Sequence, residues 1–429
     1  MNRLPPDKTL PASSAVKTEI EDPLISETDA ICGETLIGSR TAPAILLEGA
    51  LERSRSRTAP EAFQLVGEMF YALHERRASS ALPLESLQRR LAESGGPVWQ
   101  CGSHLHIPRV EGRMFLVTDL EGHMEYLEEI FRKHDLLERM VNGDSQGQVH
   151  LAVLGDTVDR GGRRASEILE FLFELKLAHG LWDRIHILSG NHELEPDGIQ
   201  RRREHGGFYD EVVVHRESYR QLGDPRALTL QDATTWCREY FPQDGEFPSL
   251  RVALWRAFNE AFQSSPLTIT TENGLYISHA GITNKGLFEL VDGNLIGSAV
   301  SRAEAYSALG QAWSERAVVK DLVWSDFSLG DTGISHNFRG QDRNGNTIPG
   351  PGLAFGIDAA RSFLTLLGAR IHIRGHQKTP PDAEMKLGVG TWAADDTVVT
   401  TNTGEAREYL EVGLRGDISG AQDLTVHRL

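Results

Sequence analysis

The stretch Val149-His-Leu-Ala-Val-Leu-Gly155-Asp156-Thr-Val-Asp159-Arg160-Gly161 joins an apolar run of strand length directly to a polar motif. Four more polar motifs follow apolar runs in the same way: Asp119-Leu-Glu121-Gly-His123, Gly190-Asn191-His192-Glu193, Ser278-His279-Ala-Gly281 and Arg374-Gly-His376-Gln377. One short match arises by chance, but five along one chain indicate a common site. Because α/β folds collect their sites from the ends of distant strands, the pattern predicts an α/β protein with its site there.

The spacing of apolar residues gives the expected elements. The expected strands are 114–117, 149–154, 185–188, 275–277 and 371–373. The expected helices between them are 124–134, 165–178, 250–262 and 358–367, the last ending at Gly368. Three histidines inside the strands have a structural rather than a functional interpretation: His150, His186 and His372.

The rest of the chain differs in composition. Residues 1–58 are rich in Pro, Ser, Thr, Ala and Glu with little periodicity, so we expect a flexible N-terminal tail. Residues 59–110 carry two helical patterns and no chemical motif. The expected division is therefore a tail at 1–58, a helical N-terminal region at 59–110, a catalytic domain at 111–415 with a helical cap at about 195–262, and a C-terminal tail at 416–429.

Composition excludes several functional classes. The 429 residues carry a formal charge of −17, which argues against a binder of nucleic acid or anionic membranes. No apolar stretch is long enough to cross a bilayer, and we expect no standard secretory signal, because no hydrophobic segment follows the charge near Met1. Cys32, Cys101 and Cys237 are widely separated, which fits a reducing compartment. We therefore expect a cytoplasmic protein without membrane insertion, with export by a signal-less secretion system as the alternative; oligomeric state is not predicted.

The motifs supply oxygen and nitrogen ligands for two divalent cations. The candidate ligands at strand ends are Asp119, Asp156, Asn191, His279 and His376. Two ions ~3.5–4 Å apart need a shared ligand, and a carboxylate can bridge them. A water between such ions has its pKa pulled toward neutrality, so it would attack phosphorus as hydroxide. No Gly-x-Ser-x-Gly or cysteine motif competes for the role of nucleophile.

Other residues in the motifs suit phosphate chemistry. Arg160 and Arg339 are candidates for binding phosphate oxygens, because a guanidinium offers two parallel donors. His192 could protonate the leaving oxygen, with Asp159 holding its imidazole. Each residue alone could be an ordinary turn, core or ion-pairing residue. Their joint occurrence favours catalysis.

Residues from about 113 to 403 resemble the metallophosphoesterase superfamily, specifically the phosphoprotein phosphatase family that includes calcineurin. The resemblance extends to segments between the motifs: Gly207-Phe-Tyr-Asp-Glu211, Trp255–Phe262, Val323-Trp-Ser-Asp326, Arg339-Gly340 and Ala354-Phe-Gly356. It implies an α/β calcineurin-like fold, in which helices flank a central β-sandwich and a di-metal site lies at the C-terminal ends of strands.

The resemblance also implies roles. Asp119 and Asp156 would hold the first ion. The second ion would be held by Asp156, Asn191, His279 and His376. Phosphate would be bound by two arginines, Arg160 and Arg339, and the leaving group would be protonated by His192 with Asp159.

Three positions depart from the family pattern. Glu121 stands where the family has a ligand histidine, and its harder oxygen favours Mn²⁺, Mg²⁺ or Ca²⁺ over Fe or Zn. The alternatives are ligation by His123 or a weakened first site. Ala280 replaces a glycine after His279, a small change. Residues 400–404 occupy the region of a tyrosine-bearing loop, so the preference for Ser/Thr over Tyr stays open.

The sequence therefore predicts a metal-dependent phosphomonoesterase, a protein phosphatase acting on phospho-Ser/Thr or phospho-Tyr in a protein or peptide. Two divalent ions are the expected cofactors, Mn²⁺ first, with Mg²⁺, Ca²⁺, Fe or Zn as alternatives. The alternative functions are a diadenosine tetraphosphate-type nucleotide hydrolase and a pseudophosphatase that binds without catalysis.

Overall fold

The computed structural model describes residues 43–57, 82–93, 95–158, 165–194, 265–284, 288–291, 294–297, 301–329, 332–341, 346–377 and 385–429, with scattered residues at 61–80 and 262–263. The chain divides into two units, Met1–Arg40 and Thr41–Leu429, and every described residue belongs to the second. The predicted cap at 195–262 lies outside the described residues, apart from Phe262.

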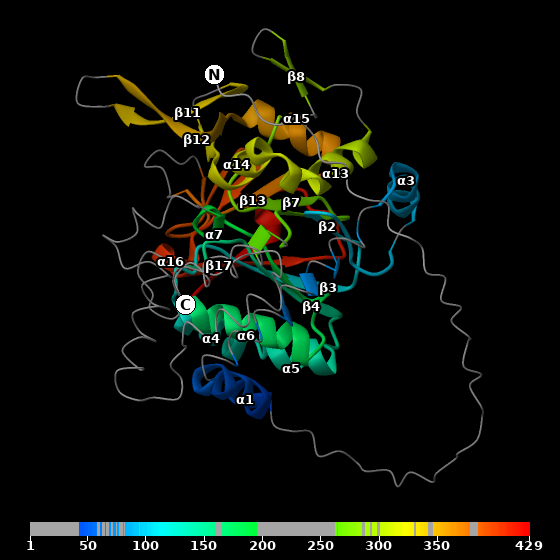
Figure 1. Ribbon diagram of the computed structural model, residues 1–429, viewed down its shortest axis with the longest axis vertical. Helices are drawn as coiled ribbons and strands as arrows, with labels where there is room; N and C mark the ends of the chain where they lie inside the picture. Colours follow the sequence, from blue (N-terminus) through cyan, green and yellow to red (C-terminus); the bar gives the residue numbers. More distant parts are fainter. Residues whose placement is uncertain are drawn as a thin grey trace, which may run out of the picture. The chain divides into compact units, whose positions relative to one another are not determined.

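Two β-sheets form a sandwich in this unit (Figure 1). In spatial order, the first sheet contains β1 (Trp99–Cys101), β2 (His104–Ile107), β6 (Thr268–Thr271), β7 (Leu275–Ser278), β13 (Ile371–Arg374), β16 (Val398–Thr400), β15 (Trp392–Ala394) and β14 (Met385–Lys386). The second contains β18 (Leu424–Arg428), β17 (Glu408–Gly413), β3 (Gly112–Val117), β4 (Gln148–Val153) and β5 (Ile185–Ile187). The predicted calcineurin-like α/β fold with its central β-sandwich is confirmed.

The described residues also form two smaller sheets. One has the order β10 (Asp326–Phe327), β12 (Thr347–Phe355) and β11 (Ile334–Gln341). The other is a hairpin of β8 (Phe288–Val291) and β9 (Asn294–Gly297). The first of these sheets matters for the site, because β10 ends close to the loop that follows β13.

Helices cover the outer face of each sheet. Beside the five-stranded sheet lie α1 (Pro43–Ser56), α4 (Met124–Lys133), α5 (Leu136–Asn142) and α6 (Ala165–Ala178). Beside the eight-stranded sheet lie α3 (Leu84–Ala92), α13 (Arg302–Gly310), α14 (Arg316–Trp324) and α15 (Ile357–Leu367). Short helices complete the described part: α7 (Asn191–Leu194), η3 (Ala312–Ser314), α16 (Thr403–Ala406) and η4 (Ala421–Asp423). None of the described helices combines the length and hydropathy needed to span a membrane.

Alternation along the strands creates the layers. In β3, Met114 and Leu116 point between the two sheets, whereas Phe115 and Val117 point to the helices. Successive side chains of a strand face opposite sides, so a strand buried on both faces is apolar throughout. The five predicted strands and the helices expected at 124–134, 165–178 and 358–367 are confirmed within one or two residues. Gly368 ends α15 in the left-handed conformation, with φ of 69°.

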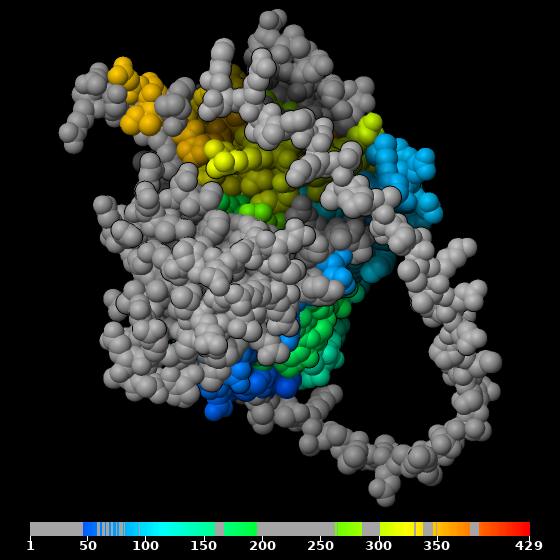
Figure 2. Space-filling view, viewed as in Figure 1, coloured from blue at the N-terminus to red at the C-terminus, as the bar shows by residue number. Residues whose placement is uncertain are grey.

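Parts of the predicted tails and of the helical region form regular elements in the described residues, whereas residues 1–42 lie outside them. Residues 43–56 form α1, which packs on α6, as Figures 1 and 2 show. Residues 99–107, expected in a helical region, form β1 and β2 of the large sheet. Residues 424–428 form β18, which pairs with β17. These segments contribute residues to the margins of the core, with β1 and β18 each at the edge of a sheet.

Arginines attach the end of α1 to acidic residues of the helical layer. Arg57, 12% exposed, lies 2.6 Å from the Glu174 carboxylate and 3.6 Å from that of Glu170. These carboxylates are 6% and 4% exposed. Arg53 contacts Glu174 at 2.5 Å from its more exposed position. Buried carboxylates are costly unless a cation compensates them, so Arg57 stabilises the docked segment.

We predict that Arg57→Met lowers the free energy of unfolding by about 3 kcal/mol, because it removes the more buried of the two arginines at Glu174 and a cation 3.6 Å from Glu170. Urea denaturation followed by circular dichroism measures the change. The control is Arg415→Met, which breaks an exposed pair with Glu111 (76% and 60% exposed) and should cost less than about 1 kcal/mol. Equal, small effects of both variants would mean that the segment is not docked in solution.

Candidate metal centre

Loops from both sheets bring polar residues to one edge of the sandwich. Asp119 follows β3, Asp156 follows β4, and Asn191 begins α7 after β5. From the other sheet, His279 directly follows β7 and His376 lies two residues beyond β13. The strands β3, β4 and β5 are parallel neighbours, and β7 is parallel to β13, so their carboxyl ends fall side by side.

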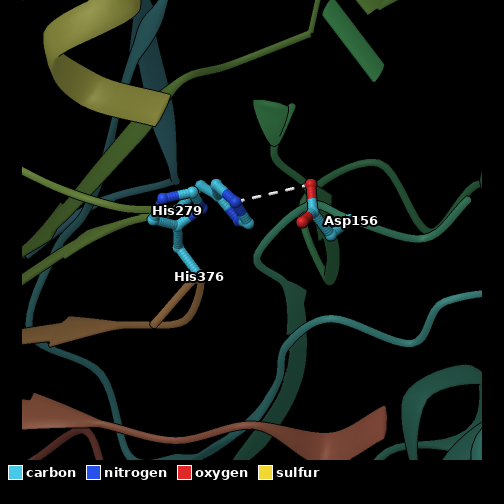
Figure 3. A group of neighbouring side chains, drawn as sticks. All are labelled: Asp156, His279 and His376. Atoms are coloured by element: carbon cyan, nitrogen blue, oxygen red, sulfur yellow. Dashed lines mark ion pairs between the residues drawn. The ribbon is translucent and has the colours of Figure 1, made fainter. Parts of the chain in front are cut away.

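Four of these side chains converge at short distances. Ligand atoms of Asp156, His279 and His376 all lie within 4.8 Å of one another, and Figure 3 shows the two imidazoles on one side of the carboxylate. Oδ1 of Asn191 lies 2.9 Å from Nε2 of His279 and 2.8 Å from Nδ1 of His376. Among the residues that the structure describes, this is the one His/Cys/Asp/Glu cluster with such spacing.

The hydrogen-bonding groups of this cluster fit a bound cation. Nδ1 of His279 lies 2.8 Å from the Leu154 carbonyl, which can only accept, so in the neutral ring Nε2 presents a lone pair. That lone pair faces Oδ1 of Asn191 and, at 3.4 Å, Oδ1 of Asp156. Oδ2 of Asp156 is buried and has no hydrogen-bond partner in the described part of the chain. Buried acceptors facing one another are destabilising unless a cation lies between them, so this donor set suits a divalent metal ion.

The protonation states agree with metal binding. Burial lowers the pKa of His279, because desolvation disfavours the imidazolium form. Burial alone would raise the pKa of Asp156, but the positive charge that His279 and His192 carry when protonated outweighs it and lowers that pKa. The two shifts favour an ionised carboxylate and a neutral imidazole, which are the forms that ligate a metal.

Unusual backbone conformations aim these side chains. The φ angles of Asp119, Asp156 and His376 are 45°, 49° and 68°, in the left-handed region that L-residues rarely adopt. Two glycines permit the close approach of the carboxylates. A Cβ on Gly375 would lie 2.3 Å from Oδ2 of Asp119, and one on Gly190 would lie 2.4 Å from Oδ1 of Asp156.

Of the residues expected at the first ion, Asp156 belongs to this cluster, whereas Asp119 and Glu121 do not. The Asp119 carboxylate accepts the backbone N–H of His376 at 3.1 and 3.2 Å, which ties the two motifs together. Glu121 is 6% exposed, with φ of 50°, in the same loop as Asp119. Neither carboxylate belongs to the group of ligand atoms within 4.8 Å.

His123, the alternative first-site ligand, points to other partners. Its Nδ1 lies 2.8 Å from the Glu125 carboxylate, and its ring stacks on Tyr126 with 4.8 Å between centroids. It occupies the N-cap position of α4. The His123 ring is therefore held by contacts with Glu125 and Tyr126, and ligation by Glu121 stays a prediction.

The residues expected to bind phosphate and protonate the leaving group are described only in part. The imidazole of His192 is 15% exposed, with Nε2 3.8 Å from Oδ2 of Asp156, and its backbone N–H donates to Oδ1 at 3.0 Å. Asp159 and Arg160 lie outside the described residues, as does the side chain of Arg339, whose backbone is in β11.

Glu193 is a supporting residue to which the sequence analysis gave no role. Its carboxylate accepts the backbone N–H groups of Asp156, Thr157 and Gly190 at 2.7–2.9 Å, and the Thr157 hydroxyl at 2.7 Å. Burial and the charge of Asp156 raise the pKa of Glu193, while four donors favour its ionised form. One side chain thus fastens the loops after β4 and β5. Its position beside His192 was visible in the sequence, but its inward direction was not.

The fold and the site together define a class, the metallophosphoesterases, in which loops at the edge of a β-sandwich gather metal ligands. A sequence model of the family described as "Metallophos: Calcineurin-like phosphoesterase" matches residues 112–380. The chain belongs to this family. The match begins at β3 and ends just after His376, so it contains the whole candidate metal centre.

Individual relatives are distant. The chain is 24% identical over 349 residues to the "Probable serine/threonine-protein phosphatase" of Encephalitozoon cuniculi, covering 77% of this chain and 60% of that relative's length. A protein serine/threonine phosphatase from Saccharomyces cerevisiae, with similarity to human phosphatase PP5, is similar in structure, with 17% identity, a TM-score of 0.44, and 81% and 89% of the two chains covered. A cold-active protein tyrosine phosphatase is similar at 12% identity and a TM-score of 0.35, with 76% and 80% covered.

We predict that Glu193→Gln lowers the free energy of unfolding by about 2 kcal/mol and weakens metal binding, because an amide offers one acceptor atom where four donors converge. Urea denaturation and metal analysis of the dialysed protein measure the two effects. Glu111→Gln, at an exposed ion pair, is the matched control and should change neither. Unchanged stability of Glu193→Gln would show that the loops hold their positions without this carboxylate.

Proposed function

We propose that this chain is a metal-dependent phosphomonoesterase that removes phosphate from proteins or peptides. The observation that carries the proposal is the convergence of Asp156, Asn191, His279 and His376 around buried acceptor atoms that lack a donor. Membership of the calcineurin-like phosphoesterase family supports the reaction class. A relative named as a serine/threonine-protein phosphatase supports a protein substrate.

In this proposal the candidate ligands would hold two metal ions. Asp156, Asn191, His279 and His376 would hold one ion, and Asp119, Glu121 and Asp156 the other, with Asp156 shared. When bound, two divalent ions polarise the phosphoryl oxygens and make water available as a nucleophile near neutral pH. Carboxylate, amide and imidazole ligands with an added hard carboxylate favour Mn²⁺, with Mg²⁺ next.

His192 supplies the proton for the leaving oxygen in this proposal. Its backbone is fixed by the hydrogen bond to Asp156, and its imidazole reaches the rim of the cluster while staying partly accessible. A donor at this position lies on the margin of the metal cluster, where a leaving group can depart to solvent. Asp159 would orient the imidazole.

Two arginines would bind the phosphate oxygens. Arg160 follows Asp156 by four residues, and Arg339 lies in β11 two residues beyond Asn337. Guanidinium groups bind phosphate through paired N–H donors and stay charged, which balances the substrate dianion. The phosphate would thereby be oriented for in-line attack.

Metal dependence tests the central proposal. Chelator-stripped protein should not hydrolyse p-nitrophenyl phosphate, and Mn²⁺ should restore the largest activity among Mn²⁺, Mg²⁺, Ca²⁺, Zn²⁺ and Fe²⁺ added singly. Asp156→Asn should lower kcat/KM by about 1000-fold, or about 4 kcal/mol of transition-state stabilisation. The control is Asp396→Asn, an exposed aspartate with φ of 52° and thus the same backbone conformation.

Activity in wild type that Asp156→Asn abolishes would support the proposal, and a panel of phospho-Ser, phospho-Thr and phospho-Tyr peptides would then give the preference. Folded wild-type protein that binds Mn²⁺ but hydrolyses none of these substrates would instead favour a pseudophosphatase. Hydrolysis of diadenosine tetraphosphate but not of phosphopeptides would favour a nucleotide hydrolase.

Leaving-group dependence tests the role of His192. His192→Asn should lower kcat/KM for phenyl phosphate by about 10²–10⁴-fold, because the poor leaving group needs a proton. The loss with p-nitrophenyl phosphate should be much smaller, because nitrophenolate departs unprotonated. Steady-state kinetics with both esters measures the ratio, and an equal loss for both would assign His192 a structural role only.

A further inference from the structure

A carboxylate on β10 faces the outer nitrogen of one candidate ligand. Nδ1 of His376 lies 2.8 Å from Oδ1 of Asn191 and therefore faces the cluster. The other ring nitrogen, Nε2, lies 3.7 Å from Oδ1 of Asp326. The imidazole is 5% exposed and the aspartate side chain 31% exposed. The separation of 3.7 Å exceeds a hydrogen bond, so the carboxylate faces the ring nitrogen without bonding to it in this structure.

The aspartate is held in place from its other side. Oδ2 of Asp326 accepts the side-chain N–H of Asn337 at 2.7 Å, and Asn337 is only 4% exposed. The same amide nitrogen lies 3.3 Å from the Trp324 carbonyl and 3.2 Å from the Pro351 carbonyl. Asn337 thus connects β10, β11 and β12 and leaves Oδ1 of Asp326 directed at the imidazole.

The backbone beside both residues is joined as well. The Gln377 side chain accepts the Phe327 N–H at 3.0 Å and donates to the Phe327 carbonyl at 3.0 Å. Arg374, fully buried, donates to Oε1 of Gln377 at 2.5 Å and to the Ser325 carbonyl at 2.8 Å. These bonds fasten the two residues that flank Asp326 to the loop of His376, so the pair is set by both strands.

We propose that Asp326 is the positioning residue for His376, accepting the Nε2–H and thereby presenting Nδ1 to the second metal ion. The inference rests on the proposed function. A hydrogen bond from the outer nitrogen fixes the tautomer and the ring direction and makes the inner nitrogen a better ligand. The other imidazole of the cluster has a neutral outer partner, because His279 donates from Nδ1 to the Leu154 carbonyl.

The two histidines differ in the group that faces the ring nitrogen pointing away from the cluster. The partner of His279 is a buried backbone carbonyl that cannot move away. Asp326 is a charged and partly exposed side chain. The affinity of His376 for a metal ion therefore depends on a side chain that a substitution can remove. Loss of the Asp326 carboxylate should weaken ion binding and leave the fold intact.

Metal affinity without turnover tests this inference. Mn²⁺ dissociation constants of wild type, Asp326→Ala, Asp326→Asn and Asp326→Glu are measured by competition with a fluorescent chelator. Asp326→Ala should weaken one of the two ions by about 10- to 100-fold. Asp326→Asn keeps an acceptor oxygen without the charge, so it should weaken Mn²⁺ binding less than Asp326→Ala does. Asp326→Glu keeps the charge and should also bind Mn²⁺ more tightly than Asp326→Ala. The control is Asp358→Asn, at a carboxylate that binds only the Gly333 N–H in the described contacts.

The melting temperature of the metal-free protein separates positioning from folding. Equal melting temperatures with weakened Mn²⁺ binding in Asp326→Ala would support the inference. Unchanged Mn²⁺ affinity in all three variants would overturn it, even if wild type binds two ions and is active. Wild-type protein that binds no Mn²⁺ would instead overturn the proposed function. If Asp326→Ala fails to fold, the comparison of Asp326→Asn with Asp326→Glu still decides.

Discussion

Burial of mutually facing acceptor atoms is the constraint around which this protein is built. Oδ1 of Asn191 and Nε2 of His279 lie 2.9 Å apart, with no donor hydrogen between them when the imidazole is neutral. Oδ2 of Asp156 is buried beside them without a hydrogen-bond partner among the described residues. Such an arrangement is unfavourable on its own and favourable around a cation. Metal binding and the folded state of this edge should therefore be thermodynamically linked.

Contacts around the cluster offset the backbone strain of the loops that carry it. Left-handed backbone at Asp119, Asp156 and His376 is strained, each at about 1–3 kcal/mol. Glu193 compensates by accepting three backbone N–H groups from two loops. Gly375 contributes by its lack of a side chain, because any Cβ there would meet a carboxylate oxygen. The strain is thus local to the loops, while regular strands absorb none of it.

Sequence patterns predicted the strands and their order of motifs because each strand is short, apolar and followed at once by polar residues. Asp156 and His279 could be foreseen together, since both end strands whose carboxyl ends meet. Glu193 could not, because a carboxylate in a four-residue helix is equally suited to solvent. Residues 424–428 escaped prediction for a different reason: β18 is an edge strand whose residues are mostly partly buried or exposed, so it lacks the continuous apolar run that marks the central strands.

The loop of the first motif is connected to a short helix close to the C-terminus. Residues 403–406 form α16, whose Thr403 N–H donates to the Thr118 carbonyl at 3.2 Å. A Cβ on Gly404 would lie 2.2 Å from the Asp119 carbonyl oxygen and 3.4 Å from Oε2 of Glu121. The helix therefore packs directly against the backbone that carries Glu121. A larger residue at Gly404 would displace this loop, so the position of the Glu121 side chain depends on how closely the short helix packs.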